Sequence, residues 1–414
     1  MTATPNTLSV QRPFLTALSL SLGAAVSLGL ARFSYALLLP PMRSDLGWTY
    51  LLAGAMNTGN ALGYFLGALM TPALMRRFGA YRMLVGGSIL VALFMLLSGF
   101  VSGTSLLMGQ RILSGIASAF VFISGGVLAA RLGGMHPRQA GFLIGLYYGG
   151  AGFGIVLSAW LVPATLAGAG ASSAAHGWQW AWLALGAACL LATLCMAPLA
   201  RQIPDVTRGS GAHARFRIRS FGYGLGAYFM FGAGYIGYMT FVIALLKEQG
   251  MSASMITLFY TMLGLAVLAS SRIWAGMLDY FKAGQALAIL NGLLAAATVL
   301  PALSTNRSLV FASGVLFGAV FLSVVASTTA LVRHNLPPSA WSAGISAFTT
   351  VFAFGQMAGP SLVGWVADGS GGLQRGLLFS ALALFIGALL ALRQRALPPR
   401  AEAETLQSAP SIEK

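Results

Sequence analysis

The sequence predicts an all-α integral membrane protein, with twelve transmembrane helices in two pseudo-symmetric six-helix bundles. Of its 414 residues, 57% are hydrophobic and only 8% are charged, and the mean hydropathy is +0.80. Soluble domains carry about 25% charged residues. Apolar runs of roughly 17–25 residues, long enough to cross about 30 Å of hydrocarbon, recur along the whole chain. A single long polar stretch divides these runs six and six.

Each run is expected to form one membrane-spanning helix, with an uncertainty of a few residues at its ends. In chain order the runs cover 14–41, 49–70, 82–100, 104–130, 141–163, 178–197, 221–246, 252–274, 284–303, 308–332, 341–366 and 374–392. The first run is far longer than the core of a signal peptide and no small-residue cleavage site follows it, so we expect it to remain as a helix. Short links such as 101–103 leave little room for domains outside the membrane.

The net charge of +16 follows the expected topology. When the links are assigned alternately to the two sides, Arg32 and Arg111 fall inside apolar runs. Nearly all other Lys and Arg residues fall on the side of the termini, and the exceptions are Arg43, Lys247, Arg307 and Arg375. This is the positive-inside pattern, which predicts cytoplasmic termini. The basic charge is therefore no sign of nucleic-acid binding.

The two halves resemble each other in sequence. We expect an N-terminal bundle over 1–197, a cytoplasmic linker over 198–220, a C-terminal bundle over 221–392 and a cytoplasmic tail over 393–414. The fifth and eleventh runs are both glycine-rich, and Gly359-Pro360 in the eleventh can bend its helix. Paired six-helix halves around a site at mid-membrane depth are a transporter architecture.

Several motifs carry a resemblance to the major facilitator superfamily. Arg111-Ile112-Leu113-Ser114-Gly115 resembles that family's Arg-x-x-Gln-Gly motif, with Ser in place of Gln. The stretch 274–282 resembles its Gly-x-x-x-Asp-Arg-x-Gly loop, although Tyr280 replaces the Arg. More narrowly, 29–35 followed by Leu38-Leu39-Pro40 is similar to a bacterial branch named after YbfB and YjiJ, which implies a bacterial inner membrane.

The resemblance implies gating roles for residues at the links between the second and third helices of each half and in the eleventh helix. In the first half Arg76 takes the position that the family's loop motif gives to Asp. The gating contacts attributed to that Asp are therefore not expected there. The residues expected to take part in gating are Arg76, Arg77, Trp274, Gly276, Asp279, Gly359 and Pro360.

Arg32 and Arg111 are the most informative residues for function. A guanidinium cannot lose its proton in hydrocarbon and needs a partner, water or a ligand. Arg32 lies eight residues before Pro40, at the end of its segment, and Arg111 lies seven residues after Thr104, at the start of its segment. Both of these segment ends fall on the outer side of the membrane. At 1.5 Å per residue both arginines are therefore about 10–12 Å below that side, at matching depth. The pair could hold a carboxylate, sulfonate or phosphate by bidentate hydrogen bonds. Alternatively, Arg111 bonds backbone carbonyls and stabilises packing.

Polar side chains at membrane depth complete the predicted substrate site. Asn57 and Asn60 lie one turn apart and share a helix face. Tyr235 and Tyr238 also share a helix face, and Tyr238, within a turn or two of Lys247, is a candidate for an anchor at the membrane interface. The residues predicted to contact substrate are Arg32, Tyr35, Asn57, Asn60, Arg111, Tyr147, Tyr235 and Gln356.

The acids and histidines all fall in links, at segment ends or in the tail. Proton-driven transporters usually relay protons through embedded carboxylates or His. The sequence therefore favours facilitated diffusion or anion exchange, unless a boundary acid such as Glu248 or Asp368, or the substrate itself, carries the proton. The sequence has no GxxxxGK[ST] loop, so transport driven by ATP is not expected. It also has no CxxC or HExxH spacing, so a metal site is not expected. We expect no cofactor.

These observations predict a secondary active or facilitative transporter of a small organic solute, with an anion favoured, working by alternating access. The alternatives are proton-coupled efflux of hydrophobic or cationic compounds and, from another class, a non-transporting membrane sensor. An enzyme is not expected, because no nucleophile, acid or metal cluster is visible at membrane depth. We expect a monomer in the lipid bilayer, with a small-molecule substrate and no nucleic-acid partner.

Overall fold

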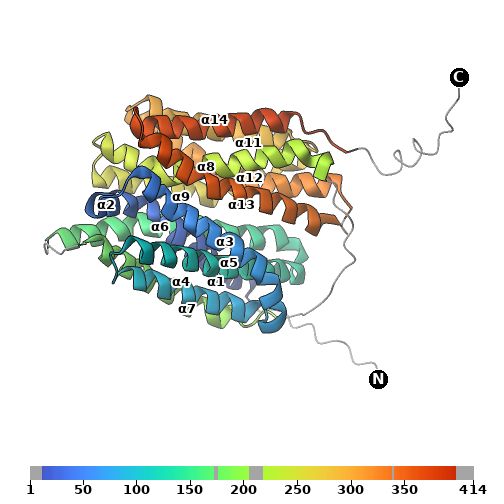
Figure 1. Ribbon diagram of the computed structural model, residues 1–414. Coiled ribbons are helices and arrows are strands. Elements are labelled where there is room, and N and C mark those ends of the chain that lie inside the picture. The colour runs from blue at the N-terminus through green and yellow to red at the C-terminus, as the bar shows by residue number, and fades with distance from the viewer. Residues whose placement is uncertain (1–11, 172–175, 205–217, 338–339, 398–414) are drawn as a thin grey trace, which may run out of the picture.

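The computed structural model describes residues 12–171, 176–204, 218–337 and 340–397, and the described residues form helices and no strands (Figure 1). The predicted all-α membrane fold is confirmed. The first span, Pro13–Leu46, is built from α1 (Pro13–Ala24), the π-helix η1 (Ala25–Phe33) and α2 (Tyr35–Leu46). The other helices are α3 (Tyr50–Phe78), α4 (Ala80–Ser98), α5 (Thr104–Met135), η2 (Pro137–Gln139), α6 (Ala140–Ala171), α7 (Trp178–Ala200), η3 (Ile218–Phe221), α8 (Gly222–Glu248), α9 (Ala253–Ile273), α10 (Ala275–Tyr280), α11 (Gln285–Leu303), α12 (Arg307–Asn335), α13 (Trp341–Ala367) and α14 (Gly372–Leu392).

Ten of the described helical segments are long and apolar enough to cross a membrane. The expected second and eleventh segments correspond to α3 and α13, which have 29 and 27 residues and also have the length to cross. Both helices are less apolar, because they carry polar residues such as Asn57, Asn60 and Gln356 toward the centre of the molecule. Their sequences are therefore those of helices that line the contact between the halves.

The helices pack as two groups (Figure 1). In the first group α5 packs against α3 and α4, α4 against α7, and α1 against α6. In the second group α14 packs against α8 and α11, and α12 against α9 and α11. The groups meet mainly where α3 packs against α13 and where α6 packs against α9. The two groups are formed by the helices before and after 205–217. The division into bundles, linker and tail stays a prediction, and most of the linker and tail lies outside the described residues.

The bundle has two ends, which we name by the described chain. The terminal end is where α1 begins and α14 ends, on the right of Figure 1, and the far end is the opposite one. The predicted topology assigns the terminal end to the cytoplasm. Several of the basic residues behind that prediction lie in 205–217, outside the described residues.

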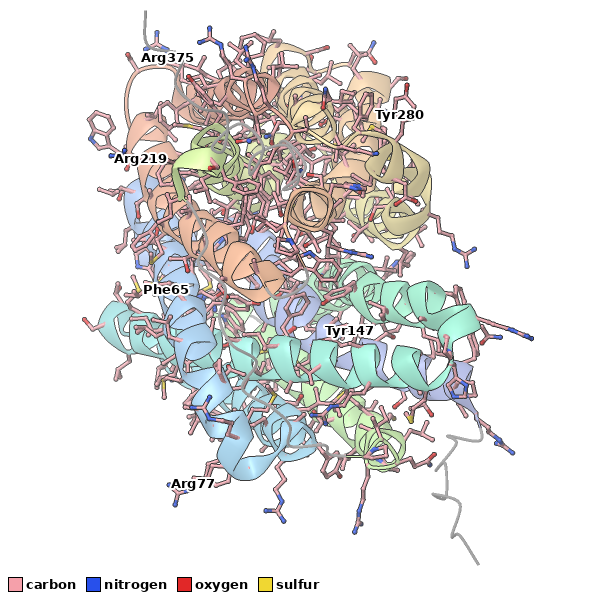
Figure 2. The ribbon with its side chains drawn as sticks, turned by 90° about the vertical axis from the view of Figure 1, so that its right-hand side faces the viewer. Phe65, Arg77, Tyr147, Arg219, Tyr280 and Arg375 are labelled. Carbon is pink, nitrogen blue, oxygen red and sulfur yellow. The ribbon has the colours of Figure 1, made fainter. Side chains whose placement is uncertain are left out.

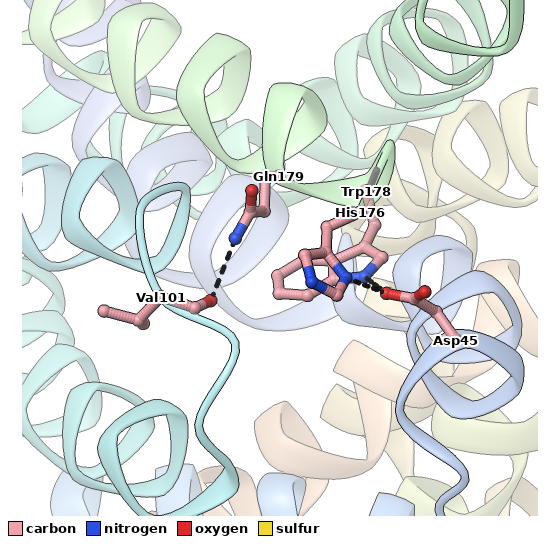
Figure 3. A network of polar contacts seen from close by, with 5 residues as sticks. All are labelled: Asp45, Val101, His176, Trp178 and Gln179. Carbon is pink, nitrogen blue, oxygen red and sulfur yellow. Dashed lines mark hydrogen bonds and ion pairs between the residues drawn. The ribbon is translucent and has the colours of Figure 1, made fainter. Parts of the chain in front are cut away.

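Polar contacts join helix ends at the far end of the first half (Figure 3). The Asp45 carboxylate lies 2.5 Å from His176 Nδ1 and accepts a 2.5 Å hydrogen bond from Trp178 Nε1. Gln179 donates to the carbonyl of Val101 at 3.2 Å. His176 adopts a left-handed backbone with φ of 55°, so these contacts hold a bend that few non-glycine residues adopt. When His176 is protonated, its contact with Asp45 is an ion pair.

Helices α3 and α13 approach very closely at the far end. A Cβ atom on Gly54 would lie 2.2 Å from the carbonyl oxygen of Pro360, and one on Gly364 would lie 2.3 Å from that of Tyr50. Only glycine allows such backbone contact. The Asp368 carboxylate, just after α13, also accepts hydrogen bonds from the backbone N–H groups of Tyr50 and Leu51 at 2.7 and 2.8 Å. The second half thus caps the N-terminus of a helix of the first half.

Candidate functional site

The first span changes its helical geometry where Arg32 lies. Through η1 the backbone forms π-type hydrogen bonds, as in the 3.1 Å bond from Ser34 N–H to the Gly29 carbonyl. Backbone carbonyls at this point accept hydrogen bonds from side chains of other helices. Arg111 donates to the Ala31 carbonyl at 2.8 Å, and the Tyr260 hydroxyl donates to the Phe33 carbonyl at 2.7 Å. Such π-turns are frequent at functional sites.

Arg111 has hydrogen-bond acceptors for both of its terminal nitrogens, whereas its Nε, like that of Arg32, is buried without one among the described residues. Its second terminal nitrogen donates to Asn57 Oδ1 at 2.9 Å, and its guanidinium carbon lies 4.8 Å from the centre of the Tyr35 ring. The Trp182 ring is also close, at 5.7 Å. The guanidinium therefore joins the first span to α3 and rests between aromatic rings, which stabilise a cation.

Neighbouring polar residues extend this network to the second half. Asn60 donates to the backbone carbonyl of Arg111 at 3.0 Å, and the Tyr35 hydroxyl donates to the Ala53 carbonyl at 2.9 Å. The Asn57 amide donates to Thr240 Oγ1 on α8 at 2.7 Å. Tyr35, Asn57, Asn60 and Arg111 are thus brought together as predicted by their depth and helix faces.

Arg32 is placed differently, because its guanidinium crosses to the other half. It is 4% exposed and donates a hydrogen bond to the side-chain oxygen of Gln356 on α13. The Tyr64 ring centre lies 5.8 Å from its guanidinium carbon. Among the described residues, Arg32 forms no ion pair, and its Nε atom is buried without a hydrogen-bond acceptor. A buried cation with a free donor is equipped to receive an anion.

The two arginines lie close together, because Arg111 donates to the carbonyl of Ala31, the residue before Arg32. This agrees with the matching depth expected from the sequence. In the described part of the chain no carboxylate is paired with either arginine, so the centre of the molecule carries uncompensated positive charge. Burial of such charge is costly unless polar groups or a ligand stabilise it.

Tyr147 and Tyr238 are held by contacts within their own halves. The Tyr147 hydroxyl donates to the Phe122 carbonyl at 2.7 Å, and its ring packs against Phe122. Tyr147 lies among the helices in Figure 2. The prediction that Tyr238 anchors the membrane interface is wrong, because its side chain is fully buried, shares a 2.7 Å hydrogen bond with Ser313 and stacks on Phe317.

The residues expected to act in gating fall into two sets. Arg76, Arg77 and Asp279 are exposed at the terminal end, and Figure 2 shows Arg77 at the periphery of the molecule. Gly276 faces open space, whereas Trp274 Nε1 donates to the Ala319 carbonyl at 2.8 Å.

The second set lies where α13 contacts other helices. A Cβ atom on Gly359 would lie 2.4 Å from the carbonyl oxygen of Ala233, and Pro360 contacts Gly54. A movement of α13 would therefore change the contacts of Gly359 with α8 and of Pro360 with α3. The gating roles of both sets remain predictions.

Sequence reasoning did not include three residues of this region: Tyr64 lies beside Arg32, Thr240 accepts from Asn57, and Phe352 lies one helical turn from Gln356. Tyr64 follows Asn60 by four residues, and Phe352 precedes Gln356 by four, so helical spacing places each on a face already selected. This signal was present in the sequence. Thr240 gave no comparable signal, because its role depends on how α8 meets α3.

The fold has relatives among solved structures. The chain is similar to a bacterial homologue of the human lysosomal transporter Spinster in an inward-facing and occupied conformation (16% identity, TM-score 0.65, 96% of this chain and 98% of that one). It is also similar to the nucleoside transporter NupG (12%, 0.67, 94% and 100%) and to the human organic anion transporter MFSD10 (17%, 0.60, 94% and 100%). At these identities the likeness concerns the fold. A search of curated proteins finds no matching relative.

The sequence of residues 24–392 matches the family described as the uncharacterised MFS-type transporter YbfB. The matched range begins at the end of α1 and finishes with α14, so it includes every helix that contributes to the arginine site. Family and fold agree on a multi-pass membrane protein that handles a small-molecule substrate. The chain belongs to the YbfB-type family of major facilitator superfamily transporters.

Proposed function

We propose that this transporter carries a small organic anion across the bilayer by alternating access, with Arg32 as the residue that binds the anionic group. The observation that carries the proposal is the environment of Arg32. Its guanidinium is 4% exposed, has a buried Nε without an acceptor and donates to Gln356 rather than to an acid. A carboxylate satisfies a guanidinium better than an amide does, because it is charged and accepts two parallel hydrogen bonds.

The position of Gln356 gives the anion a role in the transport cycle. Arg32 belongs to the first half and Gln356 to the second, so their hydrogen bond joins the halves when the site is closed. An anion that binds Arg32 takes the place of the Gln356 oxygen and changes the contact between the halves. A ligand shifts a conformational equilibrium only through such differential contacts. The site thus links anion binding to the relative position of the halves.

Arg111 supports this site through the backbone. Its hydrogen bond to Ala31 fixes the residue before Arg32, and its charge adds to the positive potential. Its terminal nitrogens already have acceptors in Ala31 and Asn57. We infer that Arg111 positions Arg32, and that Arg32 makes the direct contact with the anion.

The coupling we propose is facilitated diffusion or anion exchange. At the depth of the arginines, the described helices contribute amides, hydroxyls and aromatic rings rather than carboxylates. Glu248 and Asp368 lie at the far end, where they accept hydrogen bonds from the Tyr50 hydroxyl and from backbone N–H groups, respectively. An anion that carries its own charge through the site needs no protein proton carrier.

The test is uptake into proteoliposomes that contain the purified full chain. Matched anionic, neutral and cationic solutes are compared with and without a pH gradient. The proposal expects uptake of anions that is saturable and indifferent to the gradient. Gradient-driven transport of cations would contradict it and would favour efflux of cationic compounds. Absence of flux for every solute, together with retention of a cytoplasmic partner protein, would favour a membrane sensor.

The remaining expectations follow from the same proposal. We propose a monomer in a bacterial inner membrane with the terminal end in the cytoplasm, a small-molecule substrate and no nucleic-acid partner. The described part of α3 places Arg76 and Arg77 at the terminal end, as the positive-inside pattern requires. Labelling of single introduced cysteines at the two ends with a membrane-impermeant reagent in intact cells would test this orientation.

A further inference from the structure

A row of aromatic rings runs along one face of α8. Tyr228, Phe231, Tyr235 and Tyr238 are spaced three or four residues apart and therefore lie on one side of the helix. Their rings stack on each other or on rings of α12 and α13, with centroids 4.0–6.0 Å apart and interplanar angles of 8–20°. Phe317 and Phe321 of α12 stack on each other at 27°, and Tyr228 also meets Phe348 at 59°. We use the name aromatic column for these α8 rings together with the α12 and α13 rings that stack on them, namely Tyr228, Phe231, Tyr235, Tyr238, Phe317, Phe321 and Phe352.

The aromatic column passes directly beside the proposed anion site. Tyr235 stacks on Phe231, Phe321 and Phe352. Phe352 precedes Gln356 by one helical turn on α13, so the ring and the amide share a face. The donors for an anion and the faces of the rings therefore adjoin.

The column also lies against the first half. Phe321 meets the ring of Phe33, the residue after Arg32, edge to face at 5.8 Å. Tyr64 lies near both Arg32 and Tyr235. A solute held by Arg32 is thus bordered by rings from both halves, and the movement that separates the halves would expose ring faces to it.

Aromatic rings offer a ligand something that aliphatic side chains of equal area do not. Their faces and edges carry opposite partial charges, so a planar ring gains from offset stacking beyond the burial of its surface. Rings also keep their shape and lose little conformational freedom when a ligand binds. A row of parallel rings next to a cation with a free donor is suited to a flat solute that has an anionic group at one end.

We propose that the substrate is an aromatic carboxylate, bound with its carboxylate on Arg32 and its ring stacked beside Tyr235 and Phe352. This inference rests on the proposed function of anion transport. It adds that the rest of the solute is planar and aromatic.

Three probes of nearly equal size separate ring from charge. Benzoate has both the ring and the carboxylate, cyclohexanecarboxylate has the carboxylate on a puckered aliphatic ring, and benzamide has the aromatic ring without the charge. Dissociation constants are measured on the purified full chain by isothermal titration calorimetry. We expect benzoate to bind about 3- to 10-fold more tightly than cyclohexanecarboxylate, through stacking. If binding depended only on the burial of apolar area, cyclohexanecarboxylate would bind as tightly as benzoate or more tightly.

The Tyr235→Leu and Phe352→Leu variants test which rings are responsible. In each, the ratio of the two carboxylate dissociation constants should fall toward one, while cyclohexanecarboxylate binding changes less than about twofold. Phe259→Leu is the matched control, because Phe259 is fully buried on α9 and packs against Phe311, outside the column. That variant should keep the wild-type ratio. If one column variant fails to fold, the other and the wild-type comparison still decide.

The outcomes separate this inference from the proposed function. Equal binding of benzoate and cyclohexanecarboxylate, or an unchanged ratio in both column variants, overturns the aromatic subsite and leaves anion transport standing. Tighter binding of benzamide than of either carboxylate overturns both proposals. Absence of binding by all three probes also overturns the aromatic subsite.

Discussion

The guanidinium of Arg111 donates a 2.8 Å hydrogen bond to the carbonyl of Ala31, the residue that precedes Arg32. The two buried arginines are therefore connected through the backbone of the first span, and they have different roles. Arg111 is held by Ala31, Asn57 and two aromatic rings, whereas Arg32 extends to Gln356 in the second half. These contacts support the proposal that Arg111 positions the site and that Arg32 binds the ligand.

The Arg111→Lys substitution tests the positioning role. Lys keeps the charge but cannot donate to Ala31 and Asn57 at once in the planar geometry of a guanidinium. We expect a loss of about 1.5–3 kcal/mol of stability, measured by thermal unfolding in detergent, together with reduced anion uptake. Arg307→Lys, at an exposed position, is the control. Wild-type stability with abolished uptake would instead assign direct substrate contact to Arg111.

Replacing Gln356 by Glu places a permanent carboxylate beside Arg32. The internal anion should pair with the guanidinium and compete with substrate, so uptake should fall at least about tenfold while thermal stability rises. Gln374→Glu, the same change at an exposed position, should leave both properties unchanged. Undiminished anion uptake by Gln356→Glu would show that substrate does not use this face of Arg32.

The Gly54→Ala substitution tests the close approach of α3 and α13. The added methyl group would lie 2.2 Å from the Pro360 carbonyl oxygen, so the helices must separate for the protein to fold. We expect a loss of about 1–3 kcal/mol of stability and slower uptake, because the far end cannot close fully. On α11, Gly292 has open space around it and provides the control in Gly292→Ala. Equal behaviour of the two variants would count against a tight far-end closure.

Asp368 tests the cap that joins the halves. Its carboxylate accepts from the backbone N–H groups of Tyr50 and Leu51, and removal of an N-terminal cap costs about 0.5–2 kcal/mol. In Asp368→Ala the population with a separated far end should rise by roughly 2- to 30-fold. Double electron–electron resonance measures the separation of the helices. The spin labels are placed at Leu51 and Trp365, in a chain with Cys189 and Cys195 replaced. An unchanged distance distribution would contradict a latch at this position.

The sequence supported the fold and part of the site for identifiable physical reasons. Apolar runs as long as the bilayer is thick predicted the helices, and the run at 221–246 corresponds closely to α8 (Gly222–Glu248). A constant rise per residue placed Arg32 and Arg111 at one depth, and in the structure Arg111 donates to the carbonyl of Ala31, which precedes Arg32.

Other features depended on tertiary contacts that no local pattern encodes. The π-turn at η1 is associated with donors from α5 and α9, and sequence spacing along the first span gives no sign of it. The pairing of Arg32 with Gln356 joins residues 324 positions apart across the two halves. Tyr238 illustrates the opposite error, since its place near a helix end suggested an interface anchor although the second half buries it completely.

Anion uptake by Arg32→Gln tests the central claim most directly. Wild type, Arg32→Gln and the exposed control Arg307→Gln are reconstituted at equal density and compared for initial rates of uptake of a transported anion. The account predicts at least about 30-fold weaker anion binding in Arg32→Gln, because a buried, hydrogen-bonded charge contact is lost, and wild-type behaviour in Arg307→Gln. Anion uptake by Arg32→Gln at the wild-type rate and apparent affinity would contradict the account.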